Sequence, residues 1–151
     1  MKLLPLALAV VALAGCASSG PAAPPLPHAI TLVEPDFEEQ GGIIPMIGTL
    51  TLTITPEGEG TSVCKRQLFT DVERRAYLTN EERWELSTKV EAWVAAAGRT
   101  PPNTGKPYGT LAYGDLKATW EKGAVHPLEQ ADLILYLKKL VFSLNVVRKR
   151  G

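Results

Sequence analysis

The chain contains few of the residues that most catalytic and metal sites use. Its 151 residues include only two cysteines and two histidines. A tetrahedral zinc site would therefore have to recruit carboxylates from distant segments. The sequence also has no Gly-x-Ser-x-Gly elbow, no phosphate-binding glycine loop and no dinucleotide fingerprint. We predict that the protein is not an enzyme and holds no metal and no cofactor.

Two further absences concern charge and hydrophobic length. Sixteen Lys and Arg residues balance sixteen Asp and Glu residues, whereas nucleic-acid binding generally needs a basic surface. We therefore expect no nucleic-acid partner. The apolar run near the N-terminus is about a dozen residues long, well below the ~20 that a membrane-spanning helix needs.

That N-terminal run has the order of a secretory signal. Lys2 precedes Leu, Ala and Val residues, which lead into small residues before Cys16. The stretch Leu13-Ala14-Gly15-Cys16 resembles the lipobox of bacterial lipoproteins, in which signal peptidase II cuts before a lipidated cysteine. The resemblance implies cleavage between Gly15 and Cys16. The alternative is a conventional Ala-x-Ala site at residues 12–14, which would leave Cys16 free for a disulfide with Cys64.

Lipidation of Cys16 would make the membrane the first partner of this protein. Each buried lipid methylene contributes about 0.8 kcal/mol, so a diacylated cysteine holds a domain durably on a bilayer. We expect an extracytoplasmic, lipid-anchored protein. Ala17 and Ser18, rather than Asp, follow the cysteine. By the same resemblance, this indicates the outer membrane in a Gram-negative host.

The sequence divides into three parts. Residues 1–15 are the predicted signal peptide, and residues 16–27 are the lipidated cysteine with a Pro-rich tether that has no apolar periodicity. Residues 28–151 are long enough for a single globular domain with one hydrophobic core.

Period-two patterns predict the strands of that domain. Leu50, Leu52 and Ile54 alternate with threonines, which indicates a sheet with one aliphatic and one solvated face. Residues 56–60 suit a turn, and residues 61–69 suit the returning strand. An earlier strand is expected at 29–33, a further extended piece at 71–78, and a hairpin turns at Gly114-Asp115.

Two amphipathic helices follow from period-3.6 patterns. The first opens with a capping box of Thr79 and Glu82, should end at Gly98, and has an apolar stripe made of Leu86, Val90, Trp93, Val94 and Ala97. The second begins at Pro127, and its stripe is Leu133, Leu137, Leu140, Val141 and Leu144. The fold class is therefore α+β: a small antiparallel sheet of about four to five strands with two hairpins, and both helices packed on one face.

Some titratable residues are interpreted as neither catalytic nor metal-binding. Glu34, Asp36, Glu38 and Glu39 lack the spacing of a calcium loop, so we interpret them as a solvated acidic loop. Cys64 is interpreted as a small buried hydrophobe. His126 precedes a proline, which favours a loop or cap position at the start of the last helix.

Four segments together resemble the emfourin-like domains, which include a tight inhibitor of thermolysin-like metalloproteases. They read "GGIIPMIGTLTLTITPEG", "LTNEERWELSTKVEAWVAAAG", "YGTLAYGD" and "TWEKGAVHPLEQADLILYLKKL". The family's opening motif is replaced here by "EEQGGIIP", and the stretch "CKRQLFTDVERRAY" is longer than the usual connection. The resemblance implies the fold, and an extracytoplasmic protease as one partner class.

Two functions from different classes remain open. The first is a tethered protein-binding module with the glycine-hinged loop of Gly41, Gly42, Ile43, Ile44 and Met46, and with Trp84, which lies off the stripe of its helix, as its contacts. The second is a structural lipoprotein that assembles with other envelope proteins. An exposed loop would favour the first function, and a large apolar patch on the helices would favour the second.

Overall fold

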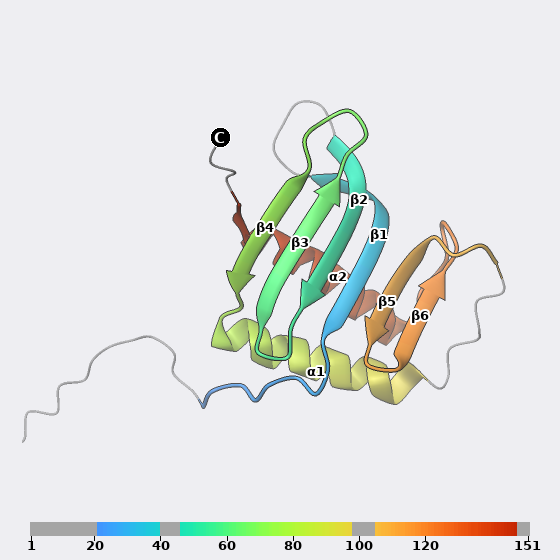
Figure 1. Cartoon of the computed structure of the whole chain (residues 1–151). Coiled ribbons are helices and arrows are strands. Elements are labelled where there is room, and N and C mark those ends of the chain that lie inside the picture. Colours follow the sequence, from blue (N-terminus) through green and yellow to red (C-terminus); the bar gives the residue numbers. More distant parts are fainter. Residues whose placement is uncertain (1–20, 40–45, 98–104, 148–151) are drawn as a thin grey trace, which may run out of the picture.

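A computed structural model of the chain describes residues 21–39, 46–97 and 105–147 (Figure 1). The described residues form β1 (Ile30–Glu39), β2 (Met46–Ile54), β3 (Glu59–Lys65), β4 (Val72–Tyr77), α1 (Asn80–Ala96), β5 (Gly109–Tyr113), β6 (Leu116–Trp120), α2 (Leu128–Ser143) and β7 (Asn145–Val146). No helix in these ranges is long and apolar enough to cross a membrane.

The strands make one antiparallel sheet, which confirms the α+β class. Within the described residues the order is β6-β5-β1-β2-β3-β4-β7. The expectation of about four to five strands was wrong, because the sheet has seven. The extended piece expected at 71–78 contains β4, whereas β7, which is only two residues long, was not expected. Two residues are too few for β7 to show a hydrophobic period in the sequence.

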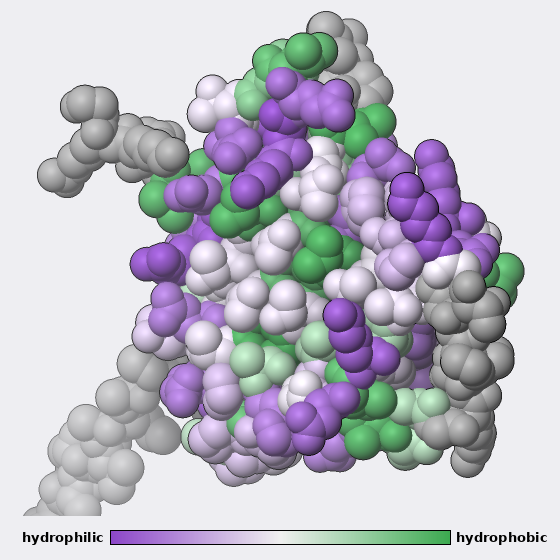
Figure 2. All heavy atoms as spheres, turned by 45° about the vertical axis from the view of Figure 1, so that its right-hand side comes forward, coloured by the Kyte–Doolittle hydropathy of each residue, from purple (hydrophilic) through white to green (hydrophobic). Residues whose placement is uncertain are grey.

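The two faces of the sheet differ as the alternation of β2 predicts. Leu50, Leu52 and Ile54 are almost fully buried, whereas Thr49 and Thr51 are exposed. Figure 2 shows the open face, where pale, near-neutral side chains gather in the middle and hydrophilic ones surround them.

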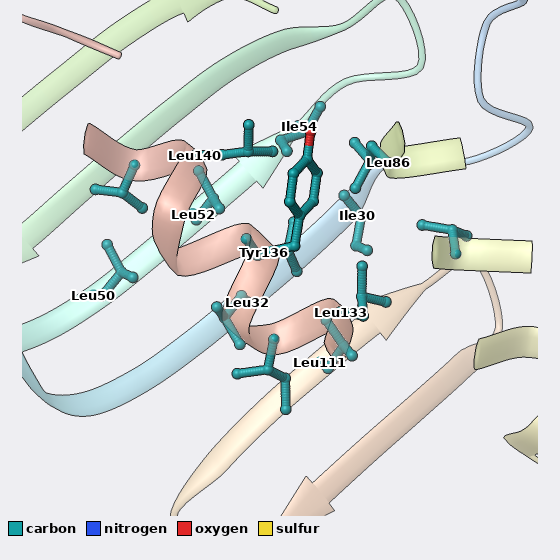
Figure 3. Packing of buried hydrophobic residues seen from close by; sticks show 14 of the residues in the cluster. Ile30, Leu32, Leu50, Leu52, Ile54, Leu86, Leu111, Leu133, Tyr136 and Leu140 are labelled. Carbon is teal, nitrogen blue, oxygen red and sulfur yellow. The ribbon is translucent and has the colours of Figure 1, made fainter. Parts of the chain in front are cut away.

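Helix α2 lies on the aliphatic face (Figures 1 and 3). Its whole predicted stripe, from Leu133 to Leu144, is buried in one cluster with the aliphatic residues of β1, β2 and β5. Burying such side chains contributes about 1.5–3 kcal/mol each and is the main force holding the helix on the sheet.

Helix α1 runs across one end of the strands and packs against α2 (Figure 1). It opens with the predicted capping box, in which the side chains of Thr79 and Glu82 each accept a hydrogen bond from the other residue's backbone N–H. Leu86, Val90 and Trp93 are buried. Val94 was expected in the core but is 45% exposed. It lies about 100° further round the helix than Trp93, at the edge of the buried stripe.

The end of the predicted tether contacts the domain. The Leu26 N–H donates to the carbonyl of Pro56 at 3.0 Å, and the Leu26 side chain is buried. The Ala23 N–H donates to Asn80 on α1. Residues 21–27 therefore run beside α1 and the β2–β3 turn, while residues 16–20 lie outside the described ranges.

Candidate functional site

The predicted binding loop connects β1 to β2. Gly41, Gly42, Ile43 and Ile44 lie outside the described residues, but Met46 is the first residue of β2. Its side chain is half-buried, and its sulfur accepts a hydrogen bond from the guanidinium of Arg66. The β3–β4 connection, residues 66–71, lies at the same end of the sheet, because β2 and β3 are antiparallel.

Exposed apolar side chains gather at this end. We call Ile47, Leu68 and Phe69 the loop-end patch; their exposures are 53%, 88% and 52%. A hollow of about 360 Å³ lies among them, and Asp36, Gly48, Thr49, Lys65 and Gln67 complete its lining. Exposed apolar side chains that lie beside polar ones around a hollow are typical of a protein-contact surface.

Local interactions hold this surface in place. The Arg66 guanidinium lies 5.3 Å from the centre of the Phe69 ring, and its Nε donates to the carbonyl of Thr70 at 2.9 Å. Gly48 forms part of the floor of the hollow. A Cβ there would lie 2.6 Å from the carbonyl oxygen of Lys65 and 2.8 Å from the Cys64 sulfur, so β2 can approach β3 in this way only with glycine.

Trp84 does not join the loop-end patch. It lies on α1, at the opposite end of the strands (Figure 1). Trp84 is 40% exposed, and its Nε1 donates to the carbonyl of Pro21 at 3.0 Å. Asn80 donates to the same carbonyl at 2.9 Å. Trp84 thus binds the N-terminal segment of its own chain.

The residues that extend the site, Leu68 and Phe69, were not singled out from the sequence. They were assigned to the end of a returning strand, where an apolar pair indicates burial. Strand β3 ends at Lys65, so both residues lie in the loop. The only signal was the placement of an apolar pair between the polar residues Gln67 and Thr70.

The acidic segment is a strand, which corrects the expectation of a solvated loop. Glu34 pairs with Lys138 of α2 at 3.1 Å, and Glu39 makes a two-pronged salt bridge with Arg74, with both N···O distances 2.7 Å. Their cationic partners come from distant parts of the chain, which explains why local composition suggested a solvated loop.

Asp36 forms part of a bulge in β1, where the pairing with β2 shifts between Glu34 and Phe37. It has φ of 58°, which is uncommon for a residue with a side chain. Its carboxylate accepts a hydrogen bond from the hydroxyl of Tyr108. That bond raises the pKa of Tyr108 to about 12, so Tyr108 remains a neutral donor at physiological pH.

Cys64 is not paired with either histidine. Its thiol is buried, and burial raises its pKa. The His126 ring packs against Trp120 at the end of β6, four strands from β3, which corresponds to about 19 Å at ~4.8 Å per strand. The His28 ring contacts Tyr113 on β5, three strands away. A Cys-His nucleophilic site would need the two groups within hydrogen-bond reach.

His126 instead belongs to a part-buried chain of hydrogen bonds with Gln130 and Trp93. Its Nδ1 lies 3.1 Å from Nε2 of Gln130, whose Oε1 accepts from Nε1 of Trp93 at 3.3 Å. Because Nε2 of Gln130 is a donor, the Nδ1 atom must be unprotonated in this arrangement. Burial lowers the pKa of His126, which favours the same neutral form.

These hydrogen bonds of His126 predict that the stability of the protein depends on pH. A histidine whose folded pKa lies below its ordinary value stabilises fully above about pH 6.5, and stability is lost as the pH falls toward the folded pKa. We expect the urea midpoint to fall between pH 7.5 and pH 5. His126→Asn keeps an acceptor but does not titrate, so it should flatten this fall, whereas His28→Asn should retain it. An unchanged fall in His126→Asn would contradict the assignment.

No protein-family model matches the chain. No curated protein matches it either.

Proposed function

We propose that this protein is a lipid-anchored envelope lipoprotein whose domain binds another protein, without catalysis, through the loop-end patch. The observation that carries the proposal is the exposure of Ile47, Leu68 and Phe69 around one hollow. Exposing such side chains to water is unfavourable, and a contact that buries them recovers about 25 cal/mol per Å² of apolar surface.

The position of the N-terminal segment implies that the lipid anchor and the loop-end patch lie at opposite ends of the domain. Five residue steps separate Cys16 from Pro21, which span at most about 18 Å. Pro21 lies on α1, and Leu26 lies at the β2–β3 turn, whereas the patch lies at the other end of β3. With Cys16 lipidated, α1 would face the membrane and the loop-end patch would point away from it.

The partner class favoured by the resemblance to emfourin-like domains is an extracytoplasmic metalloprotease. A hollow lined by both apolar and polar side chains also suits assembly with another envelope protein. Two assays separate these partners. An inhibitor lowers the activity of a thermolysin-like protease when the purified protein is added in stoichiometric amounts, and an assembly partner is recovered as a cross-linked envelope protein.

A photo-reactive amino acid at position 68 tests the binding surface. In cells that express the full chain, we expect a discrete cross-linked product at position 68, and none when the same group replaces Glu57, which is exposed at the opposite end of β3. Phe69→Asp should lower the yield of that product at least tenfold, because it places a charge in the apolar contact. Equal cross-linking from positions 68 and 57 would contradict the proposed surface.

A further inference from the structure

The proline-rich segment 21–27 lies on the domain along one of its faces. Ala23 and Leu26 are 4% and 9% exposed, whereas the other residues of the segment are exposed. Buried positions three apart correspond to one face of a polyproline II helix, which has three residues per turn. Four of the seven residues are proline, which fixes φ in the range of that conformation. The segment therefore docks as an extended, proline-rich peptide.

Two side chains of α1 bind the backbone of this segment. Asn80 accepts a hydrogen bond from the N–H of Ala23 and donates one to the carbonyl of Pro21 at 2.9 Å. Trp84 lies four residues further, on the same face of α1, and donates its indole N–H to that carbonyl at 3.0 Å. We call Asn80 and Trp84 the clasp. Proline-rich peptides are generally recognised in grooves lined by aromatic side chains, as Trp84 lines this one.

The second buried residue of the segment, Leu26, occupies an apolar pocket. Its N–H donates to the carbonyl of Pro56 at 3.0 Å, and its side chain belongs to the hydrophobic core. Ile54, Leu78 and Leu86 line the pocket, in which a gap of only about 10 Å³ is left beside Leu26. The hydrogen bonds of the clasp use backbone groups and set the position of a peptide. The close fit around Leu26 selects its side chain.

We propose that the clasp and the Leu26 pocket form a recognition site for an extended, proline-rich peptide. The peptide would carry a small residue and, three positions later, a leucine, and residues 21–27 are the ligand that the chain supplies to itself. The segment precedes β1 and lies outside the sheet, and it is held through a few backbone groups and two side chains. Segments with so few contacts open without global unfolding.

Opening of the site would change how far the domain reaches from its anchor. Release of residues 21–27 adds seven residues to the tether, which is about 22 Å at ~3.1 Å per residue. This consequence rests on the proposed lipid anchor, whereas recognition of the peptide does not. The site is therefore tested in the full chain with Cys16→Ala, where lipid plays no part.

Hydrogen exchange of the Trp84 indole N–H reports whether the site is occupied. Leu26→Asp places a charge in the apolar pocket and should release the segment, so exchange at Trp84 should become at least about tenfold faster. The indole NMR signals are assigned with Trp84→Phe. The signals of Trp93 and Trp120, which are buried in the core, should keep their positions and so report that the domain remains folded.

The peptide of residues 21–27, acetylated and amidated, is then added to the Leu26→Asp chain. A tethered segment acts at an effective concentration of millimolar order, so the free peptide is used at about 10 mM. It should slow exchange at Trp84 towards the value of the parent chain, and the same peptide with Leu26→Asp should not. An absence of any response to the first peptide would overturn the proposal, because residues 21–27 would then be a fixed part of the fold.

A second variant tests the clasp without altering the pocket. Asn80→Ala, in the chain that retains Leu26, should also speed exchange at Trp84, whereas Thr88→Ala, one turn further along α1, should not. The Thr88 hydroxyl donates within the helix, to the carbonyl of Trp84. If Leu26→Asp unfolds the domain, Asn80→Ala and the peptide provide the same test. Exchange at Trp84 that is equal in the parent and Asn80→Ala chains would overturn the clasp.

Discussion

Replacing Arg74 by methionine is expected to lower the free energy of unfolding by about 3–5 kcal/mol. Arg74 and Glu39 form a buried, two-pronged ion pair whose side chains are only 10% and 5% exposed. The variant keeps most of the side-chain volume but leaves the Glu39 carboxylate buried without its partner. An uncompensated buried charge costs more than the ion pair itself contributes.

The neighbouring arginine provides the control. Arg75 also forms an ion pair, with Glu59 at 3.5 Å, but its side chain is 64% exposed. Arg75→Met should change stability by less than about 1 kcal/mol, as exposed pairs generally do. A double variant, Glu39→Leu with Arg74→Met, removes both charges and should recover much of the loss. Urea denaturation measures all three, and equal effects of Arg74→Met and Arg75→Met would contradict the buried pair.

Replacing Trp93 by alanine is expected to lower the free energy of unfolding by about 3–5 kcal/mol. Trp93 is 1% exposed and is among the largest fully buried side chains in the described residues. The change leaves a cavity between α1 and the rest of the core. The change also removes the indole N–H that donates a hydrogen bond to the side-chain oxygen of Gln130. That buried amide oxygen is then left unsatisfied.

Trp84, on the same helix, is the matched control for Trp93. It is half-exposed and makes one hydrogen bond, to Pro21, so Trp84→Ala should cost only about 1 kcal/mol. Both variants can be followed by the urea midpoint. A loss in Trp84→Ala as large as that in Trp93→Ala would mean that the N-terminal segment contributes much more to the fold than its contacts indicate.

The fold was predictable where a hydrophobic period runs through an element. The alternation of β2 and the stripe of α2 correspond to the observed burial, and the capping box placed the start of α1. It was not predictable where charges are paired at long range. Glu39 and Arg74 are 35 positions apart, and neither indicates burial by itself. The result was an acidic segment misread as a loop.

The candidate site was only partly predictable for a related reason. Met46 was predicted as part of a glycine-hinged contact loop, and the structure makes it the first residue of β2, with Ile47, Leu68 and Phe69 around a hollow at that end of the sheet. Exposure is a property of the whole surface, so an apolar residue such as Leu68 cannot be recognised as exposed from its neighbours in the sequence. Trp84 shows the converse: its exposed position was anticipated, but its contact with Pro21 was not.

Processing of the N-terminus tests the proposed anchor most directly. The full chain and its Cys16→Ala variant are expressed in a bacterium, with and without an inhibitor of signal peptidase II, and membrane fractions are blotted. We predict that the inhibitor makes a heavier precursor accumulate for the wild type only, and that mature wild-type protein remains with the membrane. Identical processing of both chains, with release of the wild type into the soluble fraction, would contradict lipid anchoring at Cys16.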